Sequence, residues 1–377
     1  MKYLCILGRQ PEFGLLELES LFGAGSIQSF DAQTCLIDGE IDINKLGGTL
    51  KVGRLLYQGE AADLIDLPID WTKLTKHDGK IVFGLSYYGI KATPRFVTTR
   101  GLEVKKRLEG SSRFVAPKSG IQLSAAQIKF NHILDKGFEL LVAVSKQEMV
   151  VAVTESTQNI DWYSRRDYDR PARSAKVGML PPKLAQIMIN TTSSDKVFDP
   201  FCGTGVALQE ALLLGRQAQG SDLSPDMVTA SRKNLEWLKT EAKLRGIDNL
   251  PIWAVAQADA RSVGLPVGPA IVSEGYLGEN QTARPNDQKY NELKSQIEAL
   301  YNESLKNWAK QLPPSAQVTI TAPVWHTTSG WKGTQIIDSL PDLGYSLRSF
   351  SHVNTRELIY RRPDQIVGRQ LLLLKKN

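Results

Sequence analysis

The chain has 377 residues, which is long enough for two or three domains. Hydrophobic residues make up 42% and charged residues 23%, as in an ordinary soluble globular protein, and no apolar run is long enough to span a bilayer. The net charge of +6 permits a polyanionic partner but does not demonstrate one.

Cysteine and histidine are sparse and scattered along the sequence. The three cysteines show no Cys-x-x-Cys spacing, and the four histidines do not cluster. The sequence therefore predicts neither a disulfide framework nor a metal site. We expect a reduced, cytoplasmic protein.

The first 155 residues mix short strands and short helices. Strand patterns occupy residues 2–8, 34–37, 80–88, 140–144 and 149–153, and helix patterns occupy 12–22, 101–108 and 124–131. The stretch 43–57 carries both signals and is left unassigned. This mixture predicts an α+β region.

Residues 161–176 combine four arginines and a lysine with aromatic and acidic side chains. One interpretation is a solvated linker that packs on both flanking domains. The other is contact with RNA, in which Arg165, Arg166 and Arg170 meet phosphates and the rings stack on bases. The sequence leaves both open.

Strand and helix patterns alternate through the second half of the chain. Helices are predicted at 181–190, 206–214, 224–246 and 287–312, and strands at 196–199, 219–222, 252–256, 270–273, 317–321, 357–361 and 366–374. Such alternation predicts an α/β doubly wound sheet, and the last two strands predict an antiparallel hairpin at its edge.

The stretch 196–205 is a strand that ends in an acid and a glycine-containing turn, and a helix follows it. Glycine lets a ligand approach the backbone closely, and an acid about 20 residues further on is typical of a ribose-binding site. Asp222 stands 17 residues after Gly205. Leu208 occupies the third glycine position of the dinucleotide fingerprint, so a nucleoside cofactor is favoured over a nicotinamide dinucleotide.

The string Asp-Pro-Phe-Cys-Gly-Thr-Gly at 199–205 resembles the first motif of class I, S-adenosylmethionine-dependent methyltransferases. More narrowly, it is similar to that of the THUMP-domain tRNA guanine-N2 methyltransferases. The resemblance implies that Asp199 stabilises the positive methionine portion of S-adenosylmethionine, Asp222 holds the ribose and Asp259 holds the adenine amino group. The other residues expected to bind the cofactor are Pro200, Cys202, Gly203, Gly205, Leu223 and Ala260.

The sequence departs from this family where the target base is held. The family carries Asp-Pro-Pro-Tyr or Asn-Pro-Pro-Tyr after its fourth strand, whereas this chain has Ser273-Glu274-Gly275-Tyr276. Hydrogen-bond acceptors on a guanine amine localise its lone pair, and a stacked ring fixes its approach. We therefore take Ser273, Glu274 and Tyr276 as the candidate catalytic residues, with Glu274 in place of the missing Asp or Asn.

The resemblance also implies a division of the chain. It predicts an α+β domain at 1–75, a THUMP-like RNA-binding domain at 76–160, a linker at 161–176 and a methyltransferase domain at 177–377. The residues expected to contact RNA in the second of these are Lys105, Lys106, Arg107, Arg113 and Lys118. A run of charge on a helix is also commonly just a solvated face.

Three functions compete on these observations. The first is a tRNA methyltransferase that modifies N2 of a guanosine in the tRNA core, with position 10 expected. The second is an RNA-binding protein whose methyltransferase domain binds the cofactor without turnover, which the altered 273–276 motif favours. The third is a methyltransferase for DNA or another exocyclic amine, which the THUMP-like half disfavours. The expected partner is tRNA, with no metal or membrane, and the sequence identifies no partner subunit.

Overall fold

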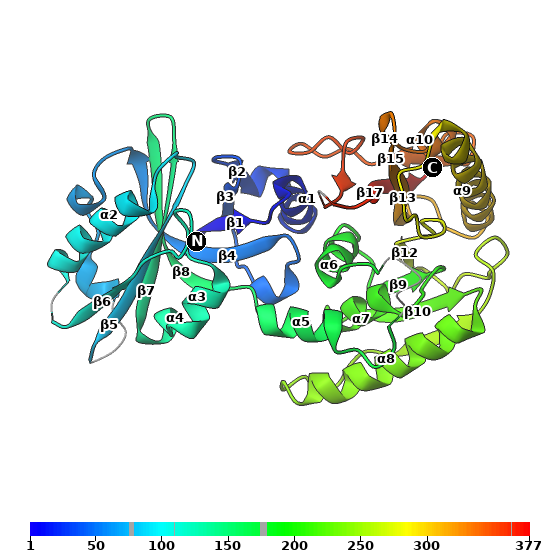
Figure 1. Ribbon diagram of the computed structural model, residues 1–377. Helices are drawn as coiled ribbons and strands as arrows, with labels where there is room; N and C mark the ends of the chain where they lie inside the picture. Colours follow the sequence, from blue (N-terminus) through cyan, green and yellow to red (C-terminus); the bar gives the residue numbers. More distant parts are fainter. Residues whose placement is uncertain (75–78, 109, 174–178, 363) are drawn as a thin grey trace. The chain divides into compact units, whose positions relative to one another are not determined.

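The computed structural model describes residues 1–74, 79–108, 110–173, 179–362 and 364–377. The chain forms two compact units, Met1–Trp162 and Tyr163–Asn377 (Figure 1). Each unit is described by itself below.

The N-terminal unit is built on one mixed sheet with the strand order β2-β3-β1-β4-β8-β7-β5-β6. Strand β5 runs parallel to β6 and β7, and the other neighbours are antiparallel. Its strands are β1 (Lys2–Leu7), β2 (Ile27–Ser29), β3 (Thr34–Asp38), β4 (Thr49–Glu60), β5 (Ile81–Tyr88), β6 (Ser112–Val115), β7 (Gly137–Ser145) and β8 (Glu148–Thr157). Its helices are α1 (Pro11–Phe22), α2 (Pro94–Arg107), α3 (Ala125–Phe130) and α4 (Ile133–Lys136).

Local sequence explains where these helices begin. Ser124 and Gln127 form a capping box at the start of α3, as two reciprocal side-chain to backbone hydrogen bonds. Helix α2 starts seven residues before the predicted helix, because Thr93 caps it and Pro94 occupies its first turn. Strand β4 occupies most of the stretch 43–57, which the sequence left unassigned.

The sheet of the N-terminal unit crosses the domain boundary that the sequence placed between residues 75 and 76. Strands β1 and β4, from before that point, pair in the same sheet as β8, β7 and β5, from after it. Residues 75–78 themselves lie outside the described residues. The two compact units divide between Trp162 and Tyr163.

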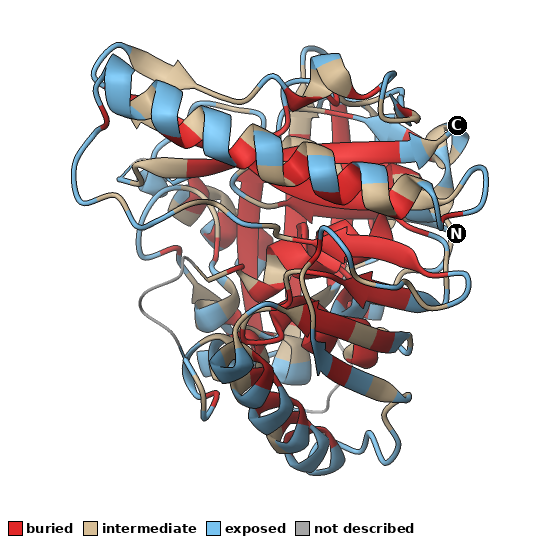
Figure 2. Ribbon diagram, turned by 90° about the vertical axis from the view of Figure 1, so that its right-hand side faces the viewer, coloured by how far each residue is buried: buried red, intermediate tan, exposed pale blue. Residues whose placement is uncertain are grey.

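The C-terminal unit is a mainly parallel sheet with the strand order β11-β10-β9-β12-β13-β17-β15. Its strands are β9 (Lys196–Asp199), β10 (Gln217–Asp222), β11 (Trp253–Gln257), β12 (Ala270–Ser273), β13 (Gln317–Thr327), β14 (Gly330–Lys332), β15 (Tyr345–Leu347), β16 (Ile359–Tyr360) and β17 (Val367–Lys376). Its helices are α6 (Pro182–Asn190), α7 (Val206–Leu213), α8 (Pro225–Lys243), α9 (Asp287–Ala309) and α10 (Ile336–Ser339), and α5 (Ile160–Tyr168) begins just before the boundary between the units. The strands are largely buried, and the outward faces of α8 and α9 are exposed (Figure 2).

The order of the strands creates a switch point between β9 and β12. From β9 the chain proceeds outward to β10 and β11, and then crosses to β12 on the other side of β9. In such sheets ligands bind at the carboxyl ends of the strands next to this point. Asp199, Asp222 and Ser273 each end one of the strands β9, β10 and β12.

The C-terminal edge differs in detail from the predicted hairpin. Strand β17 runs antiparallel between β13 and β15, so a strand absent from the sequence prediction forms the edge. The predicted strand at 357–361 is reduced to β16, which pairs with β17 over two residues.

The segment predicted as a linker is partly helical, and two of its arginines, Arg166 and Arg170, are buried in the C-terminal unit. Arg166 is buried and forms two hydrogen bonds, of 2.8 and 3.0 Å, with the buried carboxylate of Glu210 on α7. Arg170 is also buried, and its guanidinium donates to Thr204 and Gln209. The interpretation of Arg166 and Arg170 as RNA contacts is therefore wrong, because neither side chain reaches the surface. Residues 174–178 of the predicted linker lie outside the described residues.

Candidate active site

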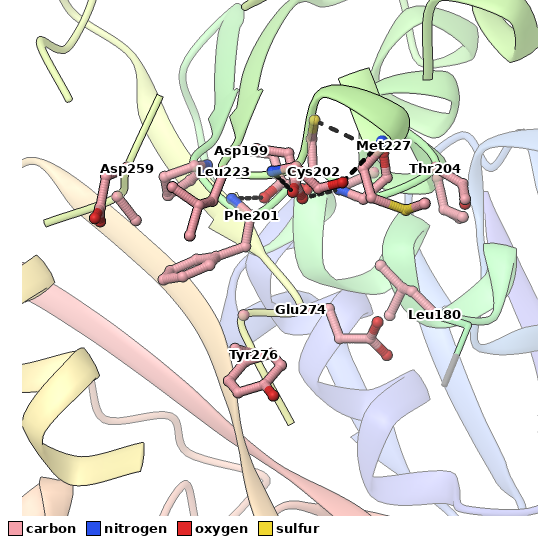
Figure 3. Close-up of a pocket in the computed structure, with 18 of the residues that line it drawn as sticks. Leu180, Asp199, Phe201, Cys202, Thr204, Leu223, Met227, Asp259, Glu274 and Tyr276 are labelled. Carbon is pink, nitrogen blue, oxygen red and sulfur yellow. Dashed lines mark hydrogen bonds between the residues drawn. The ribbon is translucent and has the colours of Figure 1, made fainter. Parts of the chain in front are cut away.

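A cavity of about 700 Å³ opens at the carboxyl ends of β9, β10 and β12, within the size range of small-molecule sites. Ten of the residues named from the sequence line it. They are Asp199, Pro200, Cys202, Gly203, Asp222, Leu223, Asp259, Ala260, Glu274 and Tyr276. Figure 3 shows Asp199 and Cys202 on one side of the cavity, with Glu274 and Tyr276 across from them.

The turn after β9 is held in shape by Asp222. The backbone N–H of Gly203 donates to Asp222 Oδ2 at 2.9 Å, and Ser224 N donates to Oδ1 at the same distance. Gly203 has a φ of 51°, in the left-handed region that glycine tolerates. Asp222 thus fixes the glycine turn, and it also lines the cavity.

Gly205 does not line the cavity, contrary to the sequence prediction. It is the N-cap of α7 with a φ of 84°, and a Cβ there would stand 2.4 Å from Ser231 Oγ. Glycine is required here because helix α8 approaches closely. Its role is to position the turn.

Asp259 lies just beyond β11 and is already paired. Arg261 donates from Nε and Nη2 to its two oxygens, at 3.0 and 2.6 Å. These hydrogen bonds hold the pKa of Asp259 below its usual value, so the group is a carboxylate at neutral pH. Asp259 and Arg261 both line the cavity.

Ser273 faces away from the cavity and contacts Asp199 instead. Its hydroxyl donates to Asp199 Oδ1 at 2.5 Å and accepts from Gly275 N at 3.0 Å, and the residue is completely buried. The assignment of Ser273 as a catalytic residue is therefore wrong. Burial raises the pKa of Asp199 to about 7, although the hydrogen bonds from Ser273 and Phe201 oppose that rise.

Glu274 lines the cavity and forms an ion pair that the sequence analysis missed. Arg369 on β17 donates from Nε to Glu274 Oε1 at 2.5 Å, and from Nη2 to the carbonyl of Met179 at 3.3 Å. The side chain of Glu274 is 13% exposed and that of Arg369 is 4% exposed. Burial raises the pKa of Glu274, and the adjacent guanidinium counteracts this.

The turn that carries Tyr276 depends on Gly275. Gly275 has a φ of 71°, and a Cβ there would lie 1.9 Å from the hydroxyl of Tyr301. That hydroxyl donates to the carbonyl oxygens of Thr321, at 2.7 Å, and Tyr276, at 3.3 Å. The turn leaves Tyr276 42% exposed at the cavity, where its ring can stack on a planar ligand.

A second group of residues that the sequence analysis did not select stands on β13, on β14 and just after β16. His326 and Trp331 stack with their ring centroids 4.7 Å apart, and the Arg361 guanidinium lies 4.8 Å from the Trp331 ring. Desolvation lowers the pKa of His326, and the positive charges of Arg284 and Arg361 lower it further. Only tertiary contacts bring these residues together, because they span 35 positions in the sequence.

The remaining basic residues proposed for RNA contact differ in exposure. Lys105, Lys106, Arg107, Arg113 and Lys118 are all exposed. Arg165 is partly exposed and pairs with Glu241 on α8 and with Asp169.

Among the described residues, no group of three potential metal ligands comes together, and no helix is both long and apolar enough to cross a membrane.

Sequence comparison finds relatives with named activities, although no family model matches the chain. It is 26% identical over 247 residues to the tRNA (guanine(10)-N2)-dimethyltransferase of Pyrococcus abyssi, which covers 63% of this chain and 68% of that protein. It is 30% identical over 151 residues to the enzyme of the same name from Methanothermobacter thermautotrophicus, which covers 39% of each chain. The match thus spans about two thirds of the first relative and well under half of the second.

Solved structures show the same architecture. TrmN from Thermus thermophilus matches over the full length of both chains with a TM-score of 0.54 and 18% identity. SMU.472, solved in complex with SAH, matches over 99% of this chain and 97% of that one, with a TM-score of 0.50 and 12% identity. At such identities the likeness concerns the fold.

The mixed α/β sheets, the cavity at the switch point and these structural neighbours together define the class of protein. The chain has a class I methyltransferase fold. The two sequence relatives described above are named tRNA (guanine(10)-N2)-dimethyltransferases.

Proposed function

We propose that this protein is an S-adenosylmethionine-dependent tRNA methyltransferase that modifies the exocyclic N2 of a guanosine, at position 10. The observation that carries the proposal is a single cavity lined both by the cofactor motif around Asp199 and Asp222 and by Glu274 and Tyr276. The named relatives support the same substrate. Transfer of labelled methyl groups from S-adenosylmethionine to guanosine in unmodified tRNA tests it.

The residues of the first half of the cavity fit S-adenosylmethionine. This molecule supplies an electrophilic methyl group on a sulfonium cation. The carboxylate of Asp222 is fixed by two backbone amides and accepts from the ribose hydroxyls. The backbone at Gly203 lies open to the cofactor, since nothing stands within 4 Å of a Cβ position there. Asp259 accepts from the adenine amino group.

The second half of the cavity serves the target base. Tyr276 stacks on the guanine, and Glu274 accepts a hydrogen bond from its amine. Guanine N2 is a poor nucleophile because its lone pair is delocalised into the ring. An oriented acceptor on one N–H favours the geometry in which that lone pair points at the methyl group.

Asp222 provides the test of the cofactor half. Asp222→Ala removes an ionised acceptor, and hydrogen bonds to charged groups are worth about 1.5–3 kcal/mol each. We expect the affinity for S-adenosylmethionine, measured by calorimetry, to fall at least about tenfold. Asp226→Ala, which removes an exposed acid four residues later, is the matched control and should bind normally. Unchanged affinity in Asp222→Ala would sink the ribose assignment.

Recognition of tRNA is proposed to involve exposed cations on each unit. In the N-terminal unit, which we propose contains a THUMP-like region, the exposed basic residues of α2 and of the segment after it meet phosphates. In the C-terminal unit, the stacked His326, Trp331 and Arg361 offer a platform for an unpaired base beside positive charge.

Affinity for tRNA should fall steeply with salt, because each neutralised phosphate releases counterions. We expect a fragment of residues 160–377, which keeps α5 whole, to bind tRNA much more weakly than the full chain and to retain cofactor binding. Titrations at several salt concentrations, monitored by fluorescence anisotropy, measure both effects. If the fragment bound tRNA as tightly as the full chain, the proposed division of labour would be incorrect.

A second candidate function is RNA binding without turnover. The observation that favours it is the inward orientation of Ser273, which leaves the position of the family's Asp or Asn without an acceptor in the cavity. Cofactor binding with no methyl transfer to any unmodified tRNA would support this alternative.

A further inference from the structure

The cavity contains one buried ion pair that the cofactor motif does not use. Glu274 follows β12, and Arg369 comes from β17, 95 positions later in the chain. Strand β17 places Arg369 directly opposite Pro323 of β13 and Tyr360 of β16. A buried ion pair is weak evidence for stability on its own, since taking two charges out of water is costly. Stability alone therefore does not explain why this ion pair lies at the part of the cavity proposed to hold the target base.

The contacts of this pair are arranged asymmetrically. Arg369 donates from Nε to Oε1 of Glu274, and its Nη2 donates to the carbonyl of Met179. The backbone of Glu274 is fixed as well, since Thr321 donates from Oγ1 to its carbonyl at 2.6 Å. The side chain is thus anchored at both ends while it still lines the cavity.

We propose that Arg369 is a positioning residue that fixes Glu274 Oε1, so that Oε2 is presented to the exocyclic amine of the target base. The proposal rests on the proposed function, and it explains how the chain works without the family's Asp or Asn. The acceptor has moved from position 273 to position 274. Ser273 donates a hydrogen bond to Asp199. The ion pair with Arg369 of β17 restrains the acceptor, a restraint that in the family follows from the rigid double proline.

A carboxylate can do more at this place than a neutral amide. As the lone pair of N2 forms the new N–C bond, the C–S bond breaks and its electron pair stays on sulfur, which becomes neutral. N2 is left with a positive charge and an extra proton. Glu274 Oε2 accepts that proton and later releases it to solvent. For this step Glu274 has to be ionised, a state that burial disfavours and Arg369 favours.

Two variants separate positioning from a purely structural ion pair. Arg369→Met should lower kcat at least about tenfold, since the acceptor loses both its orientation and its charge support. The KM for tRNA should change little. The acidic limb of the kcat–pH profile should move upward by about one unit or more, because loss of a neighbouring cation raises the pKa of a buried carboxyl. Arg369→Lys keeps the charge and should restore the limb but only part of the rate.

The acidic limb has to be assigned to Glu274, because other titratable groups surround it. Asp199 and Tyr301 are close enough to interact with its charge, and Tyr276 is two residues away. Glu274→Gln should lack the acidic limb of the kcat–pH profile, which is the limb that shifts in Arg369→Met. The double variant, Glu274→Gln with Arg369→Met, contains no unpaired buried charge and should be no slower than Glu274→Gln alone.

Folding is monitored by S-adenosylmethionine binding, and Arg245→Met, in the last turn before Gly246, is the control arginine. The positioning role would be overturned if the acidic limb of the kcat–pH profile did not shift in Arg369→Met. It would also be overturned if the rate losses of the two single variants multiplied in the double variant. Lack of methyl transfer by the wild-type protein would instead refute the proposed function itself, so the two failures are distinguishable.

Discussion

Replacing Glu274 with alanine is expected to slow methyl transfer to tRNA by about 10²-fold or more, the usual cost of losing one oriented group that stabilises a transition state. Glu274→Gln keeps an acceptor oxygen and should be affected less. Single-turnover assays with labelled S-adenosylmethionine measure the rate directly. Because the acceptor acts on the base, cofactor affinity should stay close to that of the wild type.

The matched control for this substitution is Glu279→Ala. Glu279 is an exposed acid five residues further along the same connection. Its removal is expected to leave the rate unchanged. A Glu274→Ala variant that turned over like the wild type would show that another group holds the amine.

Replacing Arg166 with methionine is expected to destabilise the C-terminal unit by about 3–5 kcal/mol, since it leaves a buried carboxylate without its partner. Arg166 and Glu210 are only 2% and 1% exposed. Urea unfolding followed by tryptophan fluorescence should show a lower transition midpoint. At temperatures where the variant stays folded, its affinity for tRNA should be unchanged.

Two further variants make this result specific. Arg165→Met removes the neighbouring cation, whose pair with Glu241 is partly exposed and should contribute less. Substituting Arg166 and Glu210 together by apolar residues removes both charges and should recover much of the stability. A fully stable Arg166→Met variant with weakened tRNA binding would reinstate Arg166 as an RNA contact.

The cofactor half of the site was predictable because its signals are local. A strand, an acid and a glycine turn lie within ten residues, and their spacing reports the geometry directly. Asp199, Gly203 and Asp222 accordingly line one cavity. Gly205 does not line the cavity, because a glycine is needed there for the close approach of Ser231 on α8.

The substrate half was not predictable to the same degree, because its key contacts are distant in sequence. Nothing near position 273 indicates that Ser273 turns inward to Asp199, 74 residues earlier. Nor does the pattern of β17 single out Arg369, which resembles any charged residue in a strand. The pairing register of β13 and β17 decides where that side chain lies.

The arginines of the 161–176 segment show the limit of reading charge from composition. Arg165, Arg166 and Arg170 share one pattern in the sequence, yet one is partly exposed and two are buried. The carboxylate that distinguishes Arg166, Glu210, stands 44 residues later on α7. At the fold level, alternation of strand and helix predicted the parallel sheet, whereas the short edge strand β15 carries too few residues for a periodic signal.

Mapping of the reaction product is the sharpest test of methyl transfer to N2 of a tRNA guanosine. The full chain would be incubated with labelled S-adenosylmethionine and unmodified tRNA, and the nucleosides would then be identified by mass spectrometry. We expect N2-methylated guanosine at position 10, and no label there in a tRNA whose guanosine 10 is replaced by adenosine. Label on a different base, or none at all while the cofactor binds, would contradict it.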